Sequence, residues 1–356
     1  MNHNAQRGFA GLRAGPCLQV HSDEATVRVA PRADITETIV RSFDGHAFAL
    51  RRSGRGSPIL LLHDMAATQR AWDPIRAALS WSNTVGTWDA RGHGASRATP
   101  EVAVPTMGLL AADLDAAITA CAPELPVLVG HGLGALTILE HLRNYDPGRV
   151  SRVVLVDQSP MMLTAPDWPL GLFGKFDASD AREFEARIRV DFADAWMRLQ
   201  ARGFDGTSGA GNDAHCRHLE TIRRNLHRLA NGSMQALWHS MIRRDYRSDL
   251  RSVQLPVLAM LGGSSNMYDA PRLGHWFLDC VPGAQVIRYP RADHALHAAA
   301  PARFARDVAA FAARRAPVAR HPLVEVVATG SDVHSPGRKS HRTHDKAVAQ
   351  TLAGRA

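Results

Sequence analysis

The residues with the clearest chemical meaning form a turn from which one side chain is missing. The apolar run Pro126-Val127-Leu128-Val129 continues as Gly130-His131-Gly132-Leu133-Gly134. This is the G-x-S-x-G frame, a sharp strand-to-helix turn that presents a nucleophilic serine, with Gly132 at the serine position. Glycine has no atom that can attack a substrate, yet it adopts strained backbone angles almost freely. The frame can therefore persist without the reactive group.

Alternating strands and helices would position this turn. Two runs flanking Asp44-Gly45 predict a β-hairpin. The continuous apolar run at residues 58–62 predicts a strand buried on both faces of a parallel sheet. The same reasoning predicts strands at 84–89, 126–129, 152–156, 256–261 and 285–289, and helices at 68–79, 107–121, 133–145 and 301–314. This alternation predicts an α/β doubly wound, mostly parallel central sheet with flanking helices.

The strand pattern stops between residues 160 and 253, and we expect this segment to be a helical cap on the sheet. One helical stripe there consists of Phe184, Ile188, Phe192, Trp196 and Leu199, and a second of Leu219, Ile222, Leu226 and Leu229. The sheet core would comprise residues 36–159 and 254–315. Residues 1–35 and the basic segment 316–356 show no periodicity, and we expect both to be disordered extensions.

Bulk composition narrows the classes of function. The chain has 356 residues, 45% hydrophobic and 21% charged, as expected of a globular protein. Its apolar runs are too short to span a membrane, and no secretory signal is visible. The four cysteines are scattered without metal-binding spacing, which favours a reducing cytoplasm. The net charge of +8 includes a basic tail, but without a clustered basic face we expect no nucleic-acid partner.

Several segments, in order, now resemble the α/β-hydrolase superfamily. Beside the Gly130–Gly134 frame stand His63-Asp64-Met65 after the strand at 58–62, and Trp72 beyond it. Residues 89–96 read Asp-Ala-Arg-Gly-His-Gly-Ala-Ser and match the family's D-x-R-G-H-G-x-S loop. Asp293-His294 is similar to the segment that delivers the family's catalytic histidine. The resemblance covers residues 36–159 and 254–315 and implies an α/β-hydrolase fold with a helical cap insert.

The resemblance also implies roles for individual residues. His294 would accept a proton, a carboxylate would orient it, and the backbone N–H groups of Met65 and Leu133 would stabilise an oxyanion. Family members place the carboxylate in either of two positions. Asp157, at the end of the strand at 152–156, is our preferred acid. The frame Gly263-Ser264-Ser265-Asn266 ends in asparagine where the other position would be, and Asp269, three residues later, is the alternative.

Two further departures bear on the chemistry. Aspartate stands at position 64, where the family usually has glycine. Its carboxylate could lie near the oxyanion donors and repel an anionic intermediate, but we expect it to face solvent or to pair with an arginine. No other serine replaces the missing one: Ser159, Ser264 and Ser265 follow strands but lie outside the G-x-S-x-G frame. A water activated by His294 could instead occupy the space that Gly132 leaves.

Two hypotheses follow. The first is a hydrolase of a small, largely apolar acyl or carbonyl compound, with His294 as general base and no serine nucleophile. The alternative is a catalytically inactive relative that binds a small ligand or a protein partner. Neither requires a cofactor or a metal ion, and neither implies a membrane.

Overall fold

The computed structural model describes residues 35–96, 104–202, 226, 228–313 and the backbone of 325–327. Nine strands form one sheet in the order β1-β2-β4-β3-β5-β6-β7-β8-β9. The six strands from β4 to β8 in that order are parallel, whereas β1, β2 and β9 are antiparallel to their neighbours. The strand bounds are Thr36–Arg41, Ala47–Ser53, Pro58–Leu62, Thr84–Thr87, Val127–His131, Arg152–Val156, Val257–Gly262, Gln285–Tyr289 and Glu325–Val327 for β1 to β9.

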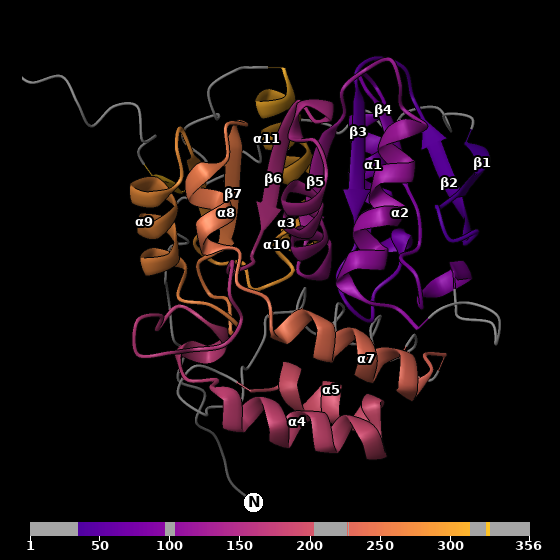
Figure 1. Cartoon of the computed structure of the whole chain (residues 1–356). Coiled ribbons are helices and arrows are strands. Elements are labelled where there is room, and N and C mark those ends of the chain that lie inside the picture. Colours follow the sequence, from indigo (N-terminus) through magenta and orange to yellow (C-terminus); the bar gives the residue numbers. More distant parts are fainter. Residues whose placement is uncertain (1–34, 97–103, 203–225, 227, 314–324, 328–356) are drawn as a thin grey trace, which may run out of the picture.

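Helices cover both faces of the sheet (Figure 1). The helices α1 (Asp73–Leu79) and α11 (Pro301–Ala312) lie on one face, with the short α10 (Leu296–Ala299) beside α11. The other face carries α2 (Met107–Thr119), α3 (Leu133–Asn144), α8 (Arg247–Ser252) and α9 (Ala270–Cys280). Short 3-10 turns occur at Gln69–Trp72, Gly94–Ser96, Pro147–Arg149 and Leu172–Gly174.

The hydrophobic core is two clusters separated by the sheet, because successive strand residues point to opposite faces. In β3, for example, Leu60 packs toward α2 and α3, whereas Ile59 and Leu61 pack toward α1 and α11. All five residues of β3 and all five of β5 are buried. The predicted doubly wound α/β architecture is therefore confirmed, and the strand after the hairpin is buried on both faces.

Among the described residues, three helices form a cap over the carboxyl ends of the parallel strands (Figure 1). It consists of α4 (Ala178–Val190), α5 (Phe192–Gln200) and α7 (Asn231–Ile242). The first predicted stripe is divided between α4 and α5, because the Asp191 side chain accepts the Asp194 N–H and starts a new helix. Most of the second stripe lies outside the described residues; Leu226 alone within that gap is described, and it is buried.

The structure contains an edge strand, β9, and a helix, α9, that the sequence analysis does not predict. Residues 325–327, within the segment expected to be a disordered tail, form β9 against β8. Helix α9 begins after Asp269, whose side chain caps it. The remaining residues of both expected extensions lie outside the described part of the chain.

The loop at residues 89–96 is built around buried charge. The Arg91 side chain is fully buried and bonds the carboxylates of Asp44 and Asp113 at 2.6 and 2.7 Å. Asp89 accepts N–H groups from Gln69 and Ala95. The D-x-R-G-H-G-x-S segment thus ties the hairpin turn and α2 to the edge of the site.

We expect Arg91→Met to lower the free energy of unfolding by about 3–5 kcal/mol, because it leaves the buried Asp113 carboxylate without its cation. Urea denaturation measures this change. The matched control is Arg187→Met, which breaks an exposed ion pair with Glu183 and should cost less than about 1 kcal/mol. Equal losses in both variants would contradict a structural role for Arg91.

Candidate active site

The turn after β5 has the geometry of the G-x-S-x-G frame. Gly132 has φ +52° and ψ −113° at the start of α3, a backbone conformation that side chains rarely adopt. The flanking glycines are required by close packing. A Cβ on Gly130 would lie 2.4 Å from the Gly134 carbonyl carbon, and one on Gly134 would lie 2.4 Å from the Leu62 oxygen. These contacts let α3 lie directly against β3 and β5.

The histidine and the preferred acid are hydrogen-bonded to each other. His294, in the loop after β8, bonds through Nδ1 to Oδ2 of Asp157 at 2.8 Å. Asp157 is completely buried at the end of β6 and also accepts the Gly262 N–H and the Ser265 hydroxyl. Three donors therefore fix the carboxylate in place, and it fixes the imidazole. Asp157 thus orients the His294 imidazole and also binds the backbone at the end of β7 and a hydroxyl of the loop that follows.

The alternative acid is placed elsewhere. The Asp269 carboxylate accepts the Arg272 N–H and caps α9. Asn266 also has a different role, since its Nδ2 donates to the carbonyls of Gln200 and Arg202 at the end of α5. An amide at this position ties the cap to the sheet, whereas a carboxylate could not donate these bonds.

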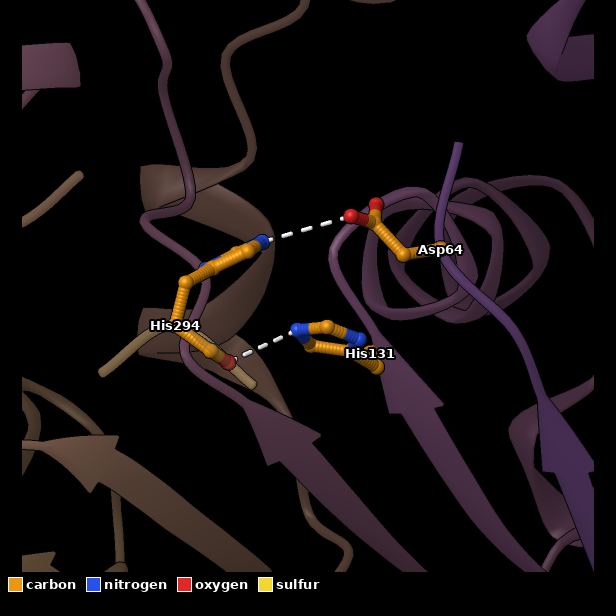
Figure 2. Close-up of side chains that lie close together, drawn as sticks. All are labelled: Asp64, His131 and His294. Carbon is orange, nitrogen blue, oxygen red and sulfur yellow. Dashed lines mark hydrogen bonds and ion pairs between the residues drawn. The ribbon is translucent and has the colours of Figure 1, made fainter. Parts of the chain in front are cut away.

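The Asp64 side chain lies beside an expected oxyanion donor, which is the less favoured of the placements that the sequence suggested. Asp64 is only 5% exposed, and its hydrogen-bond partners are a backbone N–H and an imidazole, with no arginine among them. Oδ1 accepts the Leu133 N–H at 2.8 Å, and Oδ2 lies 3.3 Å from Nε2 of His294 (Figure 2). The expectation of a solvent-facing or arginine-paired carboxylate is therefore wrong. The reason is the first turn of α3, whose N–H groups and dipole favour an anion at this point.

Asp64 fills the space that Gly132 leaves. A Cβ built on Gly132 would lie 1.9 Å from Oδ1 of Asp64 and 2.4 Å from its Cγ. Any side chain at position 132 therefore competes with the carboxylate for one volume. The aspartate at position 64 and the glycine at position 132 thus depend on each other, because the carboxylate fills the volume that the missing side chain leaves. Neither position reveals this when it is considered alone.

The oxyanion donors are also affected. The Leu133 N–H, expected to stabilise an oxyanion, donates to Asp64 instead. Met65, the other expected donor, lines the same cavity as Leu133. With Asp64 in place, the Leu133 N–H can bind a substrate oxygen only if the carboxylate moves away. Otherwise this N–H can stabilise only negative charge on an oxygen of Asp64 itself.

Charge in the site is dominated by one imidazole between two carboxylates. Burial opposes the charged form of His294, but hydrogen bonds to Asp157 and Asp64 outweigh it and raise the pKa of His294 to about 10. Burial also opposes ionisation of Asp64, but the bond to His294 and nearby positive charge hold the pKa of Asp64 well below its usual range. At neutral pH the resting site therefore holds an imidazolium facing the Asp64 carboxylate.

Other histidines near the site are structural. Burial lowers the pKa of His63 and brings the pKa of His93 to about 3, so both are neutral. His63 accepts the Ala90 N–H and His93 accepts the Ala66 N–H. His131 bonds through Nε2 to the carbonyl oxygen of His294 at 2.9 Å (Figure 2). That bond fixes the backbone of the residue that carries the central imidazole.

The described residues also offer one group of possible metal ligands. Asp64, His131 and His294 are buried, with one ligand atom each within 4.8 Å of the others. In the present arrangement Nε2 of His131 bonds the His294 carbonyl and Nε2 of His294 faces Asp64. A metal would need these side chains to move, so the donor set does not fit an ion as it stands.

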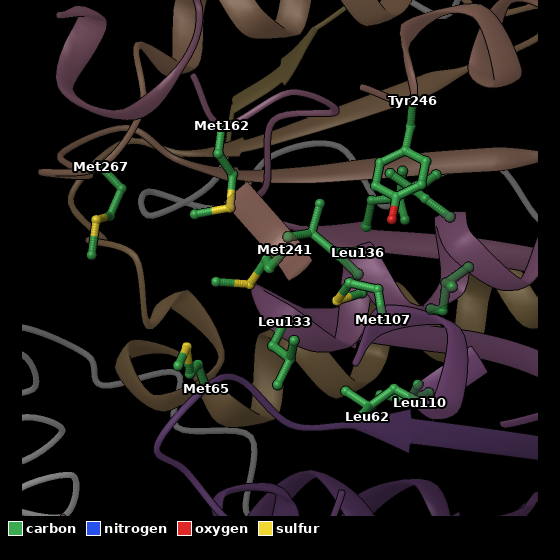
Figure 3. Packing of buried hydrophobic residues seen from close by; sticks show 14 of the residues in the cluster. Leu62, Met65, Met107, Leu110, Leu133, Leu136, Met162, Met241, Tyr246 and Met267 are labelled. Carbon is green, nitrogen blue, oxygen red and sulfur yellow. The ribbon is translucent and has the colours of Figure 1, made fainter. Parts of the chain in front are cut away.

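A small cavity of about 30 Å³ adjoins the site. That volume admits one or two water molecules. Asp64 and His294 form part of the wall, and the cap helices α5 and α7 form another part. Its lining is mostly apolar and rich in methionine, as Figure 3 shows for several of these side chains: Met65, Leu133, Met162, Leu172, Trp196, Leu199, Trp238, Met241 and Met267, with Gln158, Gln200 and Tyr268 as polar members.

The other serines near the strand ends are occupied by structural bonds. Ser159 donates to the Met161 carbonyl, Ser264 to the Pro290 carbonyl and Ser265 to Asp157. None belongs to the turn after β5. Among the described residues, no helix is long and apolar enough to cross a bilayer.

Comparison with known proteins identifies the family of this chain. The model of the alpha/beta hydrolase family matches residues 59–308, and the chain belongs to that family. The pimeloyl-[acyl-carrier protein] methyl ester esterase of Nitrosomonas europaea is 25% identical over 72% of this chain and 95% of its own. The non-heme haloperoxidase of Rhodococcus erythropolis is 24% identical over 72% of this chain and 92% of its own.

Solved structures show the same fold. An esterase from Exiguobacterium antarcticum superposes with a TM-score of 0.66 at 16% identity and covers 78% of this chain and 99% of its own. A bromoperoxidase from Bacillus anthracis gives a TM-score of 0.65 at 18% identity, over 78% of this chain and 100% of its own. The predicted α/β-hydrolase fold is confirmed.

We expect Gly132→Ala to destabilise the protein by about 1–3 kcal/mol more than Gly45→Ala, because the new methyl group overlaps the Asp64 carboxylate. Gly45 also has positive φ but has nothing within 4 Å of a new Cβ, so it isolates the backbone strain. In a double-mutant cycle with Asp64→Ala, the excess cost should disappear. Additive losses would show that the two positions do not share a volume.

The His294 ion pairs predict a pH-dependent stability. Because the folded-state pKa of His294 is raised to about 10, its contribution is complete below the unfolded pKa near 6.5 and is lost as the pH rises toward 10. The difference in unfolding free energy between wild type and His294→Gln should therefore shrink from pH 6.5 to pH 10. Urea denaturation of both proteins across this pH range measures the difference, and a difference that stays constant would contradict the His294 ion pairs.

Proposed function

We propose that this protein hydrolyses a small, largely apolar compound without a serine nucleophile. In this proposal His294 transfers protons and Asp157 orients its imidazole. The observation that carries this proposal is the hydrogen-bonded row Asp157–His294–Asp64 beside the cavity under the cap. Such a row orients an imidazole next to the space that a substrate would enter. The esterase names of the family relatives support hydrolysis as the class of reaction.

The lining of the cavity supports the substrate class. Apolar side chains from the core and the cap surround Asp64 and His294, and few of the lining residues are polar. Met65, Met162, Met241 and Met267 have unbranched, adaptable side chains that can repack around an apolar guest. The cavity volume of about 30 Å³ would have to grow to hold such a guest, by movement of those side chains or of the cap. An acyl or carbonyl compound, or another compound with a cleavable bond to carbon, suits this environment.

The protonation state refines the role of His294. In the resting site the imidazole is already protonated at neutral pH, so it is able to donate a proton but not to accept one. It becomes a general base only after it has delivered that proton or after Asp64 has lost its negative charge. A mechanism that begins with base catalysis on water would accordingly need alkaline pH.

Specific observations favour the alternative as well. Gly132 offers no nucleophile, and Asp64 occupies the Leu133 donor that an acyl intermediate would use. A catalytically inactive relative that binds a small apolar ligand would retain the cavity and lose both features. The alternative predicts ligand binding without turnover.

We expect Gly132→Ser alone to gain little activity on p-nitrophenyl esters over wild type, because its Cβ overlaps Asp64. The double variant Asp64→Gly/Gly132→Ser frees the Leu133 donor and supplies the hydroxyl beside His294. It should exceed Gly132→Ser by about 10²–10³-fold in kcat, the value of one oxyanion donor. Steady-state kinetics with short-chain and medium-chain esters measures this.

Wild-type turnover should depend on His294. His294→Gln should lower it by about 10²–10⁴-fold, the usual contribution of a positioned acid or base. The matched control His275→Gln, at an exposed site on α9, should not change it. If wild type turns over none of a panel of esters, epoxides and alkyl halides while the double variant hydrolyses esters, the alternative of a ligand-binding relative is correct.

A further inference from the structure

The Asp64 carboxylate stands where a nucleophile would stand in this fold. Oδ1 lies 1.9 Å from the position of a Cβ on Gly132. It therefore occupies the volume into which a side chain at the turn after β5 would project, although it comes from the loop after β3. Figure 2 shows the Asp64 carboxylate and the His294 imidazole facing each other.

We propose that Asp64 is the nucleophile of this protein and that its substrate is a small apolar epoxide, attacked at a saturated carbon. The inference rests on the proposed function, and it names the attacking atom and the substrate class. The carboxylate is a catalytic residue in this reaction because it forms the covalent bond to the substrate. His294 acts on the oxygen that leaves.

The two carboxylate oxygens have different environments, as a nucleophile of this kind requires. Oδ1 accepts the Leu133 N–H at 2.8 Å, which holds it at the first turn of α3. Oδ2 lies 3.3 Å from Nε2 of His294, and both residues line the cavity. Oδ2 is therefore the atom available for attack, with a proton donor beside it.

The chemistry of a carboxylate decides between acyl and alkyl substrates. Attack on an ester carbonyl would first form a tetrahedral intermediate, which could give a mixed anhydride only by expelling an alkoxide. Because an alkoxide is a poorer leaving group than the carboxylate itself, the tetrahedral intermediate returns to the starting ester. Attack on a saturated carbon forms an ordinary ester, which is stable enough to form and can be hydrolysed afterwards. An epoxide supplies ring strain and a leaving oxygen that a neighbouring acid can protonate.

The first step balances with the groups present. Oδ2 of Asp64 forms a bond to one epoxide carbon, the ring C–O bond breaks, and the electron pair goes to the ring oxygen. The Nε2 proton of His294 moves to that oxygen. The products are a hydroxyalkyl ester on Asp64 and a neutral His294, still bonded to Asp157 through Nδ1.

The second step restores the site. Neutral His294 takes a proton from water, and the resulting hydroxide adds to Cγ of Asp64. The oxyanion formed on Oδ1 is the atom already bonded to the Leu133 N–H, so the donor that Asp64 occupies becomes useful at this point. The tetrahedral intermediate expels the diol oxygen, which takes the proton from His294. A proton then passes from the Asp64 carboxyl group to His294, and the net reaction adds one water to one epoxide.

Gly132 is required by this arrangement. A side chain at position 132 would displace Oδ1 from the Leu133 N–H, because a Cβ there lies within 1.9 Å of it. The absence of a serine is thus a condition for the carboxylate to act, and not only the loss of a nucleophile.

The test is a single turnover of butylene oxide, with styrene oxide as a second probe, by excess full-length protein in water enriched in oxygen-18. In the proposed reaction the diol receives its oxygen from Asp64, so the first diol is unlabelled and the heavy oxygen appears in the peptide that carries Asp64. Mass spectrometry of the diol and of the proteolytic peptides reads both. Heavy oxygen in the first diol overturns the proposal.

Variants separate the two steps. Asp64→Asn should abolish diol formation, whereas Asp307→Asn, a buried carboxylate on α11 that lies outside the site, should retain it. His294→Gln should make the covalent ester persist at least about 10²-fold longer, visible as a mass increase of one substrate on the peptide with Asp64. Wild-type labelling of that peptide tests the proposal even if a variant fails to fold.

Other outcomes distinguish this inference from the proposed function. If wild type hydrolyses p-nitrophenyl esters but no epoxide, the proposed function holds and the nucleophile assignment is wrong. If neither is turned over and no adduct forms, both fail. If diol formation is lost on dialysis against EDTA and returns with zinc, the reaction runs through a metal on Asp64, His131 and His294, which also overturns the assignment.

Discussion

The site depends on one imidazole held between two carboxylates in a space that water hardly reaches. Asp157 and Asp64 are both buried, and His294 lies between them and bonds each. Removing an ion from water costs several kcal/mol, and only close partners can compensate. The two carboxylates and the one imidazolium together leave a net negative charge on the site. The Gly262 and Leu133 N–H groups and the Ser265 hydroxyl distribute that charge.

The surrounding loops show what holds this arrangement. His63 and His93 are neutral and bind backbone N–H groups, so they fix the path of the chain that carries Asp64. Arg91 joins the same loop to Asp44 and Asp113. His131 bonds the carbonyl of His294. The family's D-x-R-G-H-G-x-S segment is thus a support for the site, and its presence alone says nothing about turnover.

Much of the fold could be predicted from local pattern, because buried parallel strands read as continuous apolar runs. The ends of β3, β5, β6 and β8 follow from such runs, and they place Asp64, Gly132, Asp157 and His294 at one edge of the sheet. The pairing of His294 with Asp157 followed from that placement. What could not be predicted was the direction of the Asp64 side chain, since it depends on an empty volume created by a residue 68 positions later in the chain. The division of α4 from α5 and the addition of β9 likewise depend on local capping and on a distant strand partner.

The shared volume of Asp64 and Gly132 also limits how the sequence can change. A serine acquired at position 132 meets the carboxylate, and a glycine acquired at position 64 leaves a site with neither hydroxyl nor carboxylate. Each single replacement toward the ordinary family pattern therefore gives either a steric overlap or a site that lacks both groups, and only the paired change reaches the other arrangement. The arrangement with Asp64 and Gly132 and the arrangement with glycine at 64 and serine at 132 therefore exclude each other within one fold. The reason is the overlap between the Cβ of a side chain at position 132 and one carboxylate oxygen of Asp64.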